Sequence, residues 1–233
     1  MIKAVLFDLD GTLYDRDHVA QALFEQQYRE FATDLVGISR ERYLRDVHEM
    51  DEHGHGEKAA GYLRLVRSWQ LHDGLAQRLI EHFWATLDAL CVPSWHTLDT
   101  LRELRERGLK LGVITNGEGP RQRSKLARLG LDGWFDALLV AGEEGVRKPD
   151  AEIFRRALAR LDVAAHESLF VGDHPVADVE GAHRAGLKAV WIFVPYWPPP
   201  AVPDPPVIDF VSEIQPIVDG EWPIRTRRNP PET

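Results

Sequence analysis

Residues 1–12 read MIKAVLFDLDGT, a short apolar run that ends in two carboxylates. The run from Ile2 to Phe7 is apolar on both faces, which predicts a central strand of a parallel sheet. Acidic residues at the carboxyl end of such a strand lie where open α/β sheets bind ligands. Asp8 and Asp10 point the same way if the strand geometry persists, so both can face one ligand. A hard cation such as Mg²⁺, which takes carboxylate oxygens, is the predicted counterion.

The composition indicates a globular protein of modest size. With 233 residues, of which 44% are hydrophobic, the chain suits one large domain or one domain with a smaller insert. Its formal net charge of -9 argues against a broad surface for a nucleic acid polymer, because such binding needs many Lys and Arg side chains. A small anionic substrate would therefore need a local positive site.

The single cysteine, Cys91, excludes an internal disulfide and fits a reducing compartment. The chain shows neither the apolar segment of a signal peptide at its start nor a stretch of membrane-spanning length. We therefore expect a cytoplasmic protein without a membrane partner, either a monomer or a homodimer.

Residues from about Asp15 to Leu90 show helical periodicity without a convincing strand. Four amphipathic helices over this block could bury one another as a small bundle. The apolar stripes are Phe24, Tyr28, Phe31 and Leu35; Tyr43, Val47 and Met50; Tyr62, Leu65, Val66 and Trp69; and Leu75, Leu79, Phe83 and Leu87.

From Ser94 onward, helical and strand patterns alternate, which predicts right-handed βαβ crossovers. The expected fold class is α/β, a doubly wound parallel sheet formed by 1–14 and 91–220. The helical block over 15–90 is then a second domain inserted into it, and 221–233 are expected to form a poorly ordered tail. The expected strands after the first cover 109–114, 137–141, 168–171 and 188–194, and the expected helices cover 95–107, 121–129, a stretch after Pro149 and 176–185.

Each expected strand end carries a polar group that can handle a phosphate. Thr115 and Asn116 follow one strand, Lys148 lies in the loop after the next, and Asp173 with Asp178 follows another. In a parallel sheet these groups meet Asp8 and Asp10 at one edge, so the sequence predicts a single pocket there.

These motifs resemble those of the haloacid dehalogenase (HAD) superfamily of phosphohydrolases. Asp8–Thr12 is similar to the first motif of the family, Thr115–Gly117 to the second, Lys148–Pro149 to the third, and Gly172–Asp173 with Asp178 to the fourth. The resemblance covers nearly the whole chain and is closest to the phosphatase branch with a helical (C1-type) cap. It implies a Rossmann-like core, with the helical block as a lid.

The resemblance implies catalytic roles for the motif residues. Asp8 would be the nucleophile that becomes a transient aspartyl phosphate, and Asp10 the general acid and base. Thr115 and the amide of Asn116 would bind the phosphoryl oxygens, and Lys148 would stabilise charge.

The implied cofactor is Mg²⁺, held by Asp8, the backbone carbonyl of Asp10, Asp173 and Asp178. The expected function is hydrolysis of a small phosphate ester of the nucleotide, sugar phosphate or phosphoglycolate type. A sugar phosphomutase of the same fold and a non-catalytic binding protein on a phosphatase scaffold stay open as alternatives. The sequence assigns no role to His174 or to the loop with His48, His53 and His55.

Overall fold

The computed structural model describes residues 1–93 and 95–221. The chain divides into two compact units, which we call the core unit (Met1–Asp15 and the chain from Val92 onward) and the helical unit (Arg16–Cys91). The expectation of a poorly ordered tail over 221–233 falls, apart from Glu221, outside the described residues.

The core unit is built on one sheet of six strands, all parallel, in the order β3-β2-β1-β4-β5-β6. This arrangement confirms the predicted parallel α/β fold. The strands are β1 (Ala4–Phe7), β2 (Lys110–Thr115), β3 (Ala137–Val140), β4 (Ser168–Gly172), β5 (Lys188–Ile192) and β6 (Val207–Ile208).

Strand β1 occupies the middle of the sheet, as its apolar residues predict. Its four residues are fully buried, and it pairs with β2 on one side and β4 on the other. After β1 the chain builds β2 and β3 to one side and then returns to place β4 against the other edge of β1. The strand order therefore reverses between β1 and β4, and in open α/β sheets ligands bind at the carboxyl ends of the strands at such a switch point.

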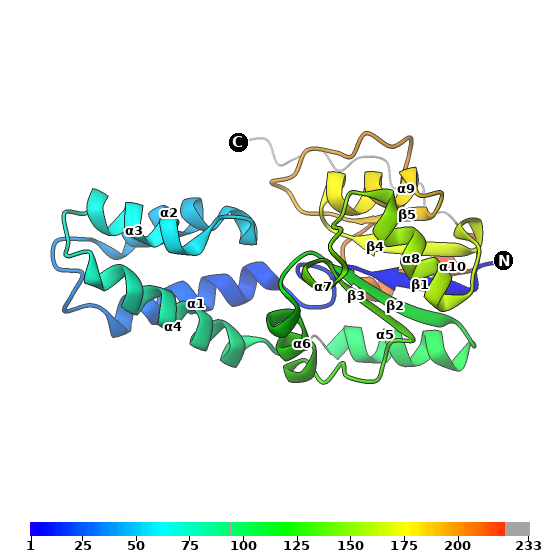
Figure 1. Cartoon of the computed structure of the whole chain (residues 1–233), viewed down its shortest axis with the longest axis horizontal. Helices are drawn as coiled ribbons and strands as arrows, with labels where there is room; N and C mark the ends of the chain where they lie inside the picture. The colour runs from blue at the N-terminus through cyan, green and yellow to red at the C-terminus, as the bar shows by residue number, and fades with distance from the viewer. Residues whose placement is uncertain (94, 222–233) are drawn as a thin grey trace. The chain divides into compact units, whose positions relative to one another are not determined.

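Helices cover both faces of this sheet, with α5 and α8 on opposite sides of it (Figure 1). Side chains of α8 such as Ile153 and Phe154 pack on the face that carries Leu6 and Phe170, and the two phenyl rings meet edge to face with their centroids 5.0 Å apart. The helices are α5 (Trp95–Glu106), α6 (Gly119–Arg128), α7 (Ala141–Glu144), α8 (Ala151–Leu161), α9 (Gly181–Arg184) and α10 (Ile214–Val218).

Several elements of the core unit differ from the sequence expectation, among them the short helix α7, which was not expected. Instead of one helix over 176–185, a π-helical turn, η3 (Pro175–Glu180), precedes α9. The N–H of Val179 reaches back to the carbonyl of His174, five residues earlier, at 3.4 Å. Strand β6 was not expected as a strand because two residues carry no periodicity, and its place is decided by hydrogen bonds such as Trp191 N to Pro206 O at 2.8 Å.

The helical unit contains four helices that contact one another in a ring: α1 with α2, α2 with α3, α3 with α4 and α4 with α1. They are α1 (Arg16–Glu30), α2 (Arg40–Asp51), α3 (Lys58–Ser68) and α4 (Gly74–Leu90). The helix predicted from the first apolar stripe extends too far, because α1 stops at Glu30. Phe31 and Leu35 lie in the turns that follow, yet both are buried, so the stripe reflects burial rather than a longer helix.

A glutamine lies at the centre of the helical unit. Gln27 is fully buried, and its Oε1 accepts hydrogen bonds from the hydroxyls of Tyr43 and Tyr62, both at 2.6 Å. Its Nε2 donates to the carbonyl of Leu79 at 2.7 Å and lies 3.2 Å from His82 Nδ1. The amide thus uses both its acceptor and its donor groups, as a buried polar group must.

A buried ion cluster joins the start of α1 to the end of α2. Asp51, 1% exposed, lies 2.5 Å from Arg16 Nη2 through one carboxylate oxygen and 3.0 Å from Lys58 Nζ through the other. Nearby Gly54 has a φ of +96°, and a Cβ there would lie 2.6 Å from Arg16 Nε. Across 1–93 and 95–221, no helix combines the length and apolar character needed to span a bilayer.

Candidate active site

The site begins where β1 ends. Asp8, 7% exposed, follows β1, and its Oδ1 accepts a hydrogen bond from Lys148 Nζ at 2.5 Å. The same ammonium donates to Asp178 Oδ1 at 2.6 Å. Lys148 is 3% exposed, so a buried cation joins two carboxylates whose positions in the sequence are 170 residues apart. A lysine ammonium is the kind of group that stabilises charge in phosphoryl transfer.

Three carboxylates gather around this lysine. Oxygens of Asp8, Asp173 and Asp178 lie within 4.8 Å of one another. Burial raises the pKa of Asp8 to about 7 against the opposing attraction of Lys148, and Asp178 raises it further. Burial, then Asp178 and Asp8, likewise hold the pKa of Asp173 well above its usual range. When all three carboxylates are ionised, the single lysine leaves two negative charges uncompensated, and a divalent cation would balance them.

The donor set suits a hard cation, because Mg²⁺ is bound by carboxylate oxygens and keeps open positions for phosphate. Two glycines make room for the carboxylates. A Cβ at Gly172 would lie 2.4 Å from Asp178 Cγ, and one at Gly11 would lie 2.7 Å from Asp173 Oδ2. Gly11 also has a φ of +80°, a conformation that glycine adopts without strain.

Asn116 connects two loops of the site. Its Nδ2 donates to the Lys148 carbonyl and its Oδ1 accepts from the Lys148 N–H, both at 3.0 Å. This reciprocal pair ties the loop after β2 to the loop that carries Lys148. Burial by itself would lower the pKa of Lys148, but Asp178 and Asp8 more than offset it and raise that pKa, so the side chain stays charged.

Asp10 faces a different set of groups. Its Oδ1 accepts hydrogen bonds from the Tyr14 hydroxyl and from Lys125 Nζ, and its Oδ2 accepts from Gln122 Nε2 at 2.7 Å. Partial burial by itself would raise the pKa of Asp10, but Lys125 and the hydrogen bonds from Tyr14 and Gln122 outweigh it and lower that pKa to about 2. Gln122 Nε2 also lies 2.5 Å from Oγ1 of the fully buried Thr115.

The structure therefore places every predicted site residue in the core unit: after the carboxyl ends of β1, β2 and β4, in the loop between α7 and α8, and, for Asp178, in η3. Asp8, Lys148, Asp173 and Asp178 form one cluster. The side chains of Asp10 and Thr115 are bridged by Gln122, and Asn116 supports the backbone of Lys148.

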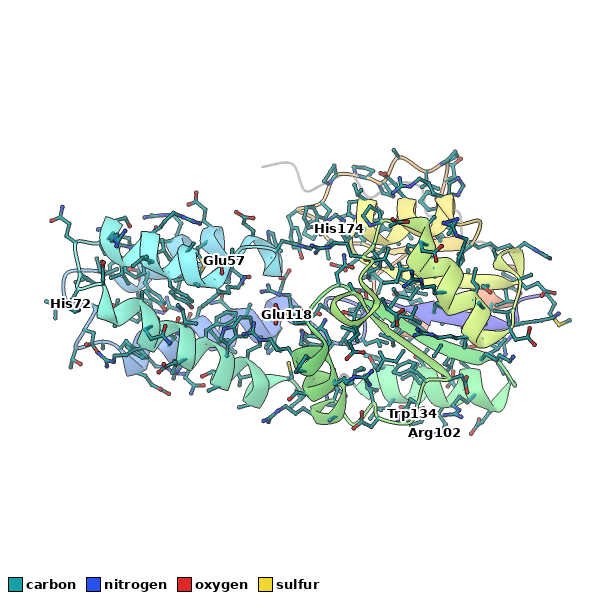
Figure 2. The ribbon with its side chains drawn as sticks, viewed as in Figure 1. Glu57, His72, Arg102, Glu118, Trp134 and His174 are labelled. Carbon is teal, nitrogen blue, oxygen red and sulfur yellow. The ribbon has the colours of Figure 1, made fainter. Side chains whose placement is uncertain are left out.

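Sequence reasoning missed Tyr14, Gln122 and Lys125. A signal was present for two of them: along α6, which begins after Glu118 (labelled in Figure 2), Gln122 and Lys125 recur with Leu126 and Leu129 at the spacing of one helix face. All four are buried. Two polar residues on an apolar stripe indicate a polar partner across the interface, but the sequence cannot name that partner.

His174, labelled in Figure 2, caps the N-terminus of η3. Its Nδ1 accepts hydrogen bonds from the N–H groups of Val176 at 3.2 Å and Ala177 at 3.1 Å, and its ring lies 4.5 Å from that of Trp197. In the helical unit, His48 pairs with Gln21 at 2.7 Å. Within the described part of the chain, the carboxylates around Asp8 form the one His, Cys, Asp or Glu cluster with the geometry of a metal site.

Comparisons with known proteins agree with this geometry. A family profile described as haloacid dehalogenase-like hydrolase matches residues 2–186. The glyceraldehyde 3-phosphate phosphatase of Methanopyrus kandleri is 36% identical over 196 residues, which cover 82% of this chain and 84% of the relative. The ribulose-1,5-bisphosphate 5-phosphatase of Halopiger xanaduensis is 34% identical over 203 residues, covering 82% of this chain and 84% of the relative.

Among solved structures, a HAD phosphatase from Thermococcus onnurineus has a TM-score of 0.63 at 28% identity, and the match covers 95% of this chain and all of that one. The resemblance in sequence extends over the motifs that form the site, and the resemblance in structure extends over both units. The chain therefore belongs to the haloacid dehalogenase-like hydrolase family and is an enzyme of its phosphatase branch.

Proposed function

We propose that this enzyme hydrolyses a small organic phosphate of the sugar phosphate type, with Mg²⁺, through a phosphorylated Asp8. One observation carries the proposal: Asp8 lies at the switch point of the sheet, 2.5 Å from the buried Lys148 and within 4.8 Å of two further carboxylates. The proposed nucleophile Asp8, the Lys148 ammonium that would bind phosphoryl oxygens, and the carboxylates that would bind a metal ion thus lie at one edge of the sheet.

In the first step, an oxygen of the Asp8 carboxylate attacks phosphorus, and the bond from phosphorus to the ester oxygen breaks. The ester oxygen leaves as an alcohol once it receives a proton, which Asp10 supplies. Lys148 and Thr115 hold the phosphoryl oxygens while negative charge is redistributed. The product of this step is an aspartyl phosphate on Asp8.

In the second step, water attacks that phosphorus and Asp10 takes a proton from the water. The bond between phosphorus and the Asp8 oxygen breaks, which restores the Asp8 carboxylate and frees phosphate. The ionised form of Asp10, which its contacts with Lys125 and Gln122 favour, is the form that this step needs. For the first step Asp10 must carry a proton. The substrate can supply this proton, because the second pKa of a phosphomonoester is near 6.

Asp8, Asp173 and Asp178 are the residues that would hold Mg²⁺, because their oxygens converge and their charge is only partly balanced by Lys148. Bound there, the ion supplies positive charge against the phosphate, which an anionic nucleophile must approach.

We assign the helical unit the role of a cap. It is inserted between β1, which is followed by the proposed nucleophile, and α5, so its first connection leaves the core unit shortly after Asp8 and Asp10. A cap on this site would exclude water other than the attacking molecule. The choice of a sugar phosphate rests on the relatives, which are named for a triose phosphate and a pentose bisphosphate.

The test is release of phosphate from a panel of triose, pentose and hexose phosphates, nucleotides and phosphoglycolate, with Mg²⁺ present. We expect sugar phosphates to be the preferred substrates and Asp8→Asn to be inactive. Phosphate release by Asp8→Asn at the wild-type rate would remove Asp8 as nucleophile.

The same panel separates the rival reactions. Isomerised sugar phosphate without net phosphate release would indicate a phosphomutase, and halide release from 2-haloacids exceeding phosphate release would indicate a dehalogenase. Absence of turnover on every ester would favour a non-catalytic binding protein.

A further inference from the structure

We propose that Lys125, Gln122 and Tyr14 are positioning residues for the acid–base step: together they hold the Asp10 carboxylate so that its Oδ2 faces the phosphoryl site. This inference rests on the proposed function, since it assigns partners to the residue that exchanges the proton. We call the three residues the Asp10 clamp.

The clamp fixes one oxygen of Asp10 from two sides. Oδ1 accepts from both the Tyr14 hydroxyl and Lys125 Nζ. The two donors are themselves in contact, because Lys125 Nζ lies 5.6 Å from the centre of the Tyr14 ring, within the range of a cation–π interaction. Tyr14 is 2% exposed and Lys125 9% exposed, so both donors are themselves buried. Oδ1 accepts two hydrogen bonds and Oδ2 accepts one, from Gln122, so Oδ2 is the oxygen with a lone pair left for a proton.

The other oxygen is aimed by Gln122. Its Nε2 lies 2.7 Å from Asp10 Oδ2 and 2.5 Å from Thr115 Oγ1, so a single amide nitrogen links the proton-carrying oxygen to a group that holds phosphoryl oxygens. The Gln122 side chain lies close against Gly117, where a Cβ would lie 3.0 Å from it. A proton donor stays within reach of its target when the residue that hydrogen-bonds it is itself fixed by packing.

A role in stability alone does not account for these residues. Gln122 and Lys125 lie on the buried face of α6, where apolar side chains would be buried at lower cost. Buried ion pairs are often replaceable by hydrophobic residues without loss of stability. The clamp therefore points to chemistry at Asp10, and all of its members lie in the core unit.

The clamp acts when the ester bond breaks. As the Asp8 oxygen bonds to phosphorus and the phosphorus–oxygen bond to the alcohol breaks, the proton on Asp10 Oδ2 moves to the leaving oxygen. The electron pair of the broken bond thus ends on a neutral alcohol. An alkoxide needs this proton, whereas a nitrophenolate is a stable anion that leaves without one. Loss of the clamp should consequently harm alkyl esters and spare aryl esters.

The experiment compares kcat for an alkyl ester, glyceraldehyde 3-phosphate or β-glycerophosphate, with kcat for p-nitrophenyl phosphate, for the full-length Mg²⁺-loaded enzyme and for Lys125→Met. We expect the alkyl-to-aryl ratio of kcat to fall by roughly tenfold to a hundredfold, since general acid catalysis contributes ~10²–10⁴-fold. Retained turnover of the aryl ester shows that the variant is folded. Lys125→Arg should restore much of the ratio.

Equal losses with both esters, or no loss with either, would overturn the inference, because a structural role does not depend on the leaving group. Tyr14→Phe keeps the ring and removes only the hydroxyl, so it tests the same ratio if Lys125→Met does not fold. It should lower the ratio, and an unchanged ratio would count against the clamp. Arg128→Met, an exposed cation on the same helix, is the matched control and should leave the ratio at its wild-type value.

An inactive wild-type enzyme on all esters would instead refute the proposed phosphatase function. An active enzyme with a clamp-independent ratio would refute only the clamp.

Discussion

Both units of this enzyme bury charged and polar side chains, but they balance them differently. In the helical unit, Asp51 faces two cations, Arg16 and Lys58, and Gln27 has a partner for its carbonyl and for its amide nitrogen. In the core unit, three carboxylates share one lysine, and the pKa of Asp8 is raised to about 7.

The difference distinguishes buried polar groups that stabilise the fold from buried polar groups that serve a catalytic site. A buried polar group that serves the fold is satisfied by its neighbours, because an unsatisfied one costs stability. A catalytic site keeps charge uncompensated until a ligand arrives, and perturbed pKa values gather there for that reason. The following predictions test this comparison, from the largest expected effect to the smallest.

The largest effect belongs to Asp8→Asn, which should reduce kcat roughly 10⁴–10⁶-fold by removing the nucleophile. Its stability in EDTA should nevertheless equal or exceed that of the wild type at pH 8. The pKa of Asp8 is raised, so its ionisation costs stability as pH rises from about 4, and the full cost is present above pH 7. The amide removes this cost. Phosphate release and thermal unfolding measure the two effects, and a large loss of stability would mean that Asp8 serves the fold.

In the helical unit, Asp51→Asn should lower the free energy of unfolding by about 3–5 kcal/mol, because it removes the buried anion that Arg16 and Lys58 share and leaves Lys58 buried without it. Hydrogen exchange in α1, α2 and α3 together with urea unfolding measures this loss. The control is Asp73→Asn, which breaks an exposed pair with Arg67 and should change nothing measurable.

The Asp51 carboxylate also predicts a pH dependence of the helical unit. Burial by itself would raise the pKa of Asp51, but Arg16 and Lys58 lower it below its usual value. A lowered pKa contributes stability that is present above the unfolded value of about 3.9 and is lost as pH falls through the folded value. Wild-type protection of α2 should therefore fall only below about pH 4, and Asp51→Asn should not show this acid transition.

Mg²⁺ should stabilise the core unit, by about 2.7 kcal/mol at a free concentration of 100 times the dissociation constant. The stabilisation should grow from pH 6 to pH 8, because the metal competes with protons on Asp8 and Asp173, whose pKa values are raised. Thermal unfolding with and without EDTA checks this. Asp173→Asn should lose the response, and Asp132→Asn, an exposed carboxylate, should keep it. A response that is the same in both variants would place the ion elsewhere.

The smallest effect is expected from Gln27→Leu, which leaves the hydroxyls of Tyr43 and Tyr62 buried without their acceptor. We expect a loss of about 1–3 kcal/mol in urea unfolding. Adding Tyr43→Phe and Tyr62→Phe should recover part of it, because the unsatisfied donors are then gone as well. A triple variant less stable than Gln27→Leu alone would show that the hydroxyls have other essential partners.

Local patterns in the sequence were sufficient for the parts of the site that follow strand ends. The apolar run before Asp8 predicts a buried central strand, and parallel strands place Thr115, Lys148 and Asp173 at the same edge, so their convergence follows from topology alone. The observed parallel order of β1, β2 and β4 agrees with that reasoning. The expected helix over 95–107 differs from α5 by one residue at its end.

Elements without periodicity could not be predicted in the same way. The turn in η3 depends on a carbonyl of His174 that reaches Val179, and β6 exists because β5 offers it hydrogen bonds. Both are decided by tertiary partners rather than by local preference.

The sequence by itself determined the parallel α/β core, the helical insertion and the set of carboxylates around Lys148, because residue order along strands dictates which side chains reach one sheet edge. Only the tertiary structure decided that Asp10 faces Lys125, Gln122 and Tyr14. That choice depends on which face of α6 docks on the site. A helical period shows that a face is buried, but it carries no information about the side chain that the face will meet.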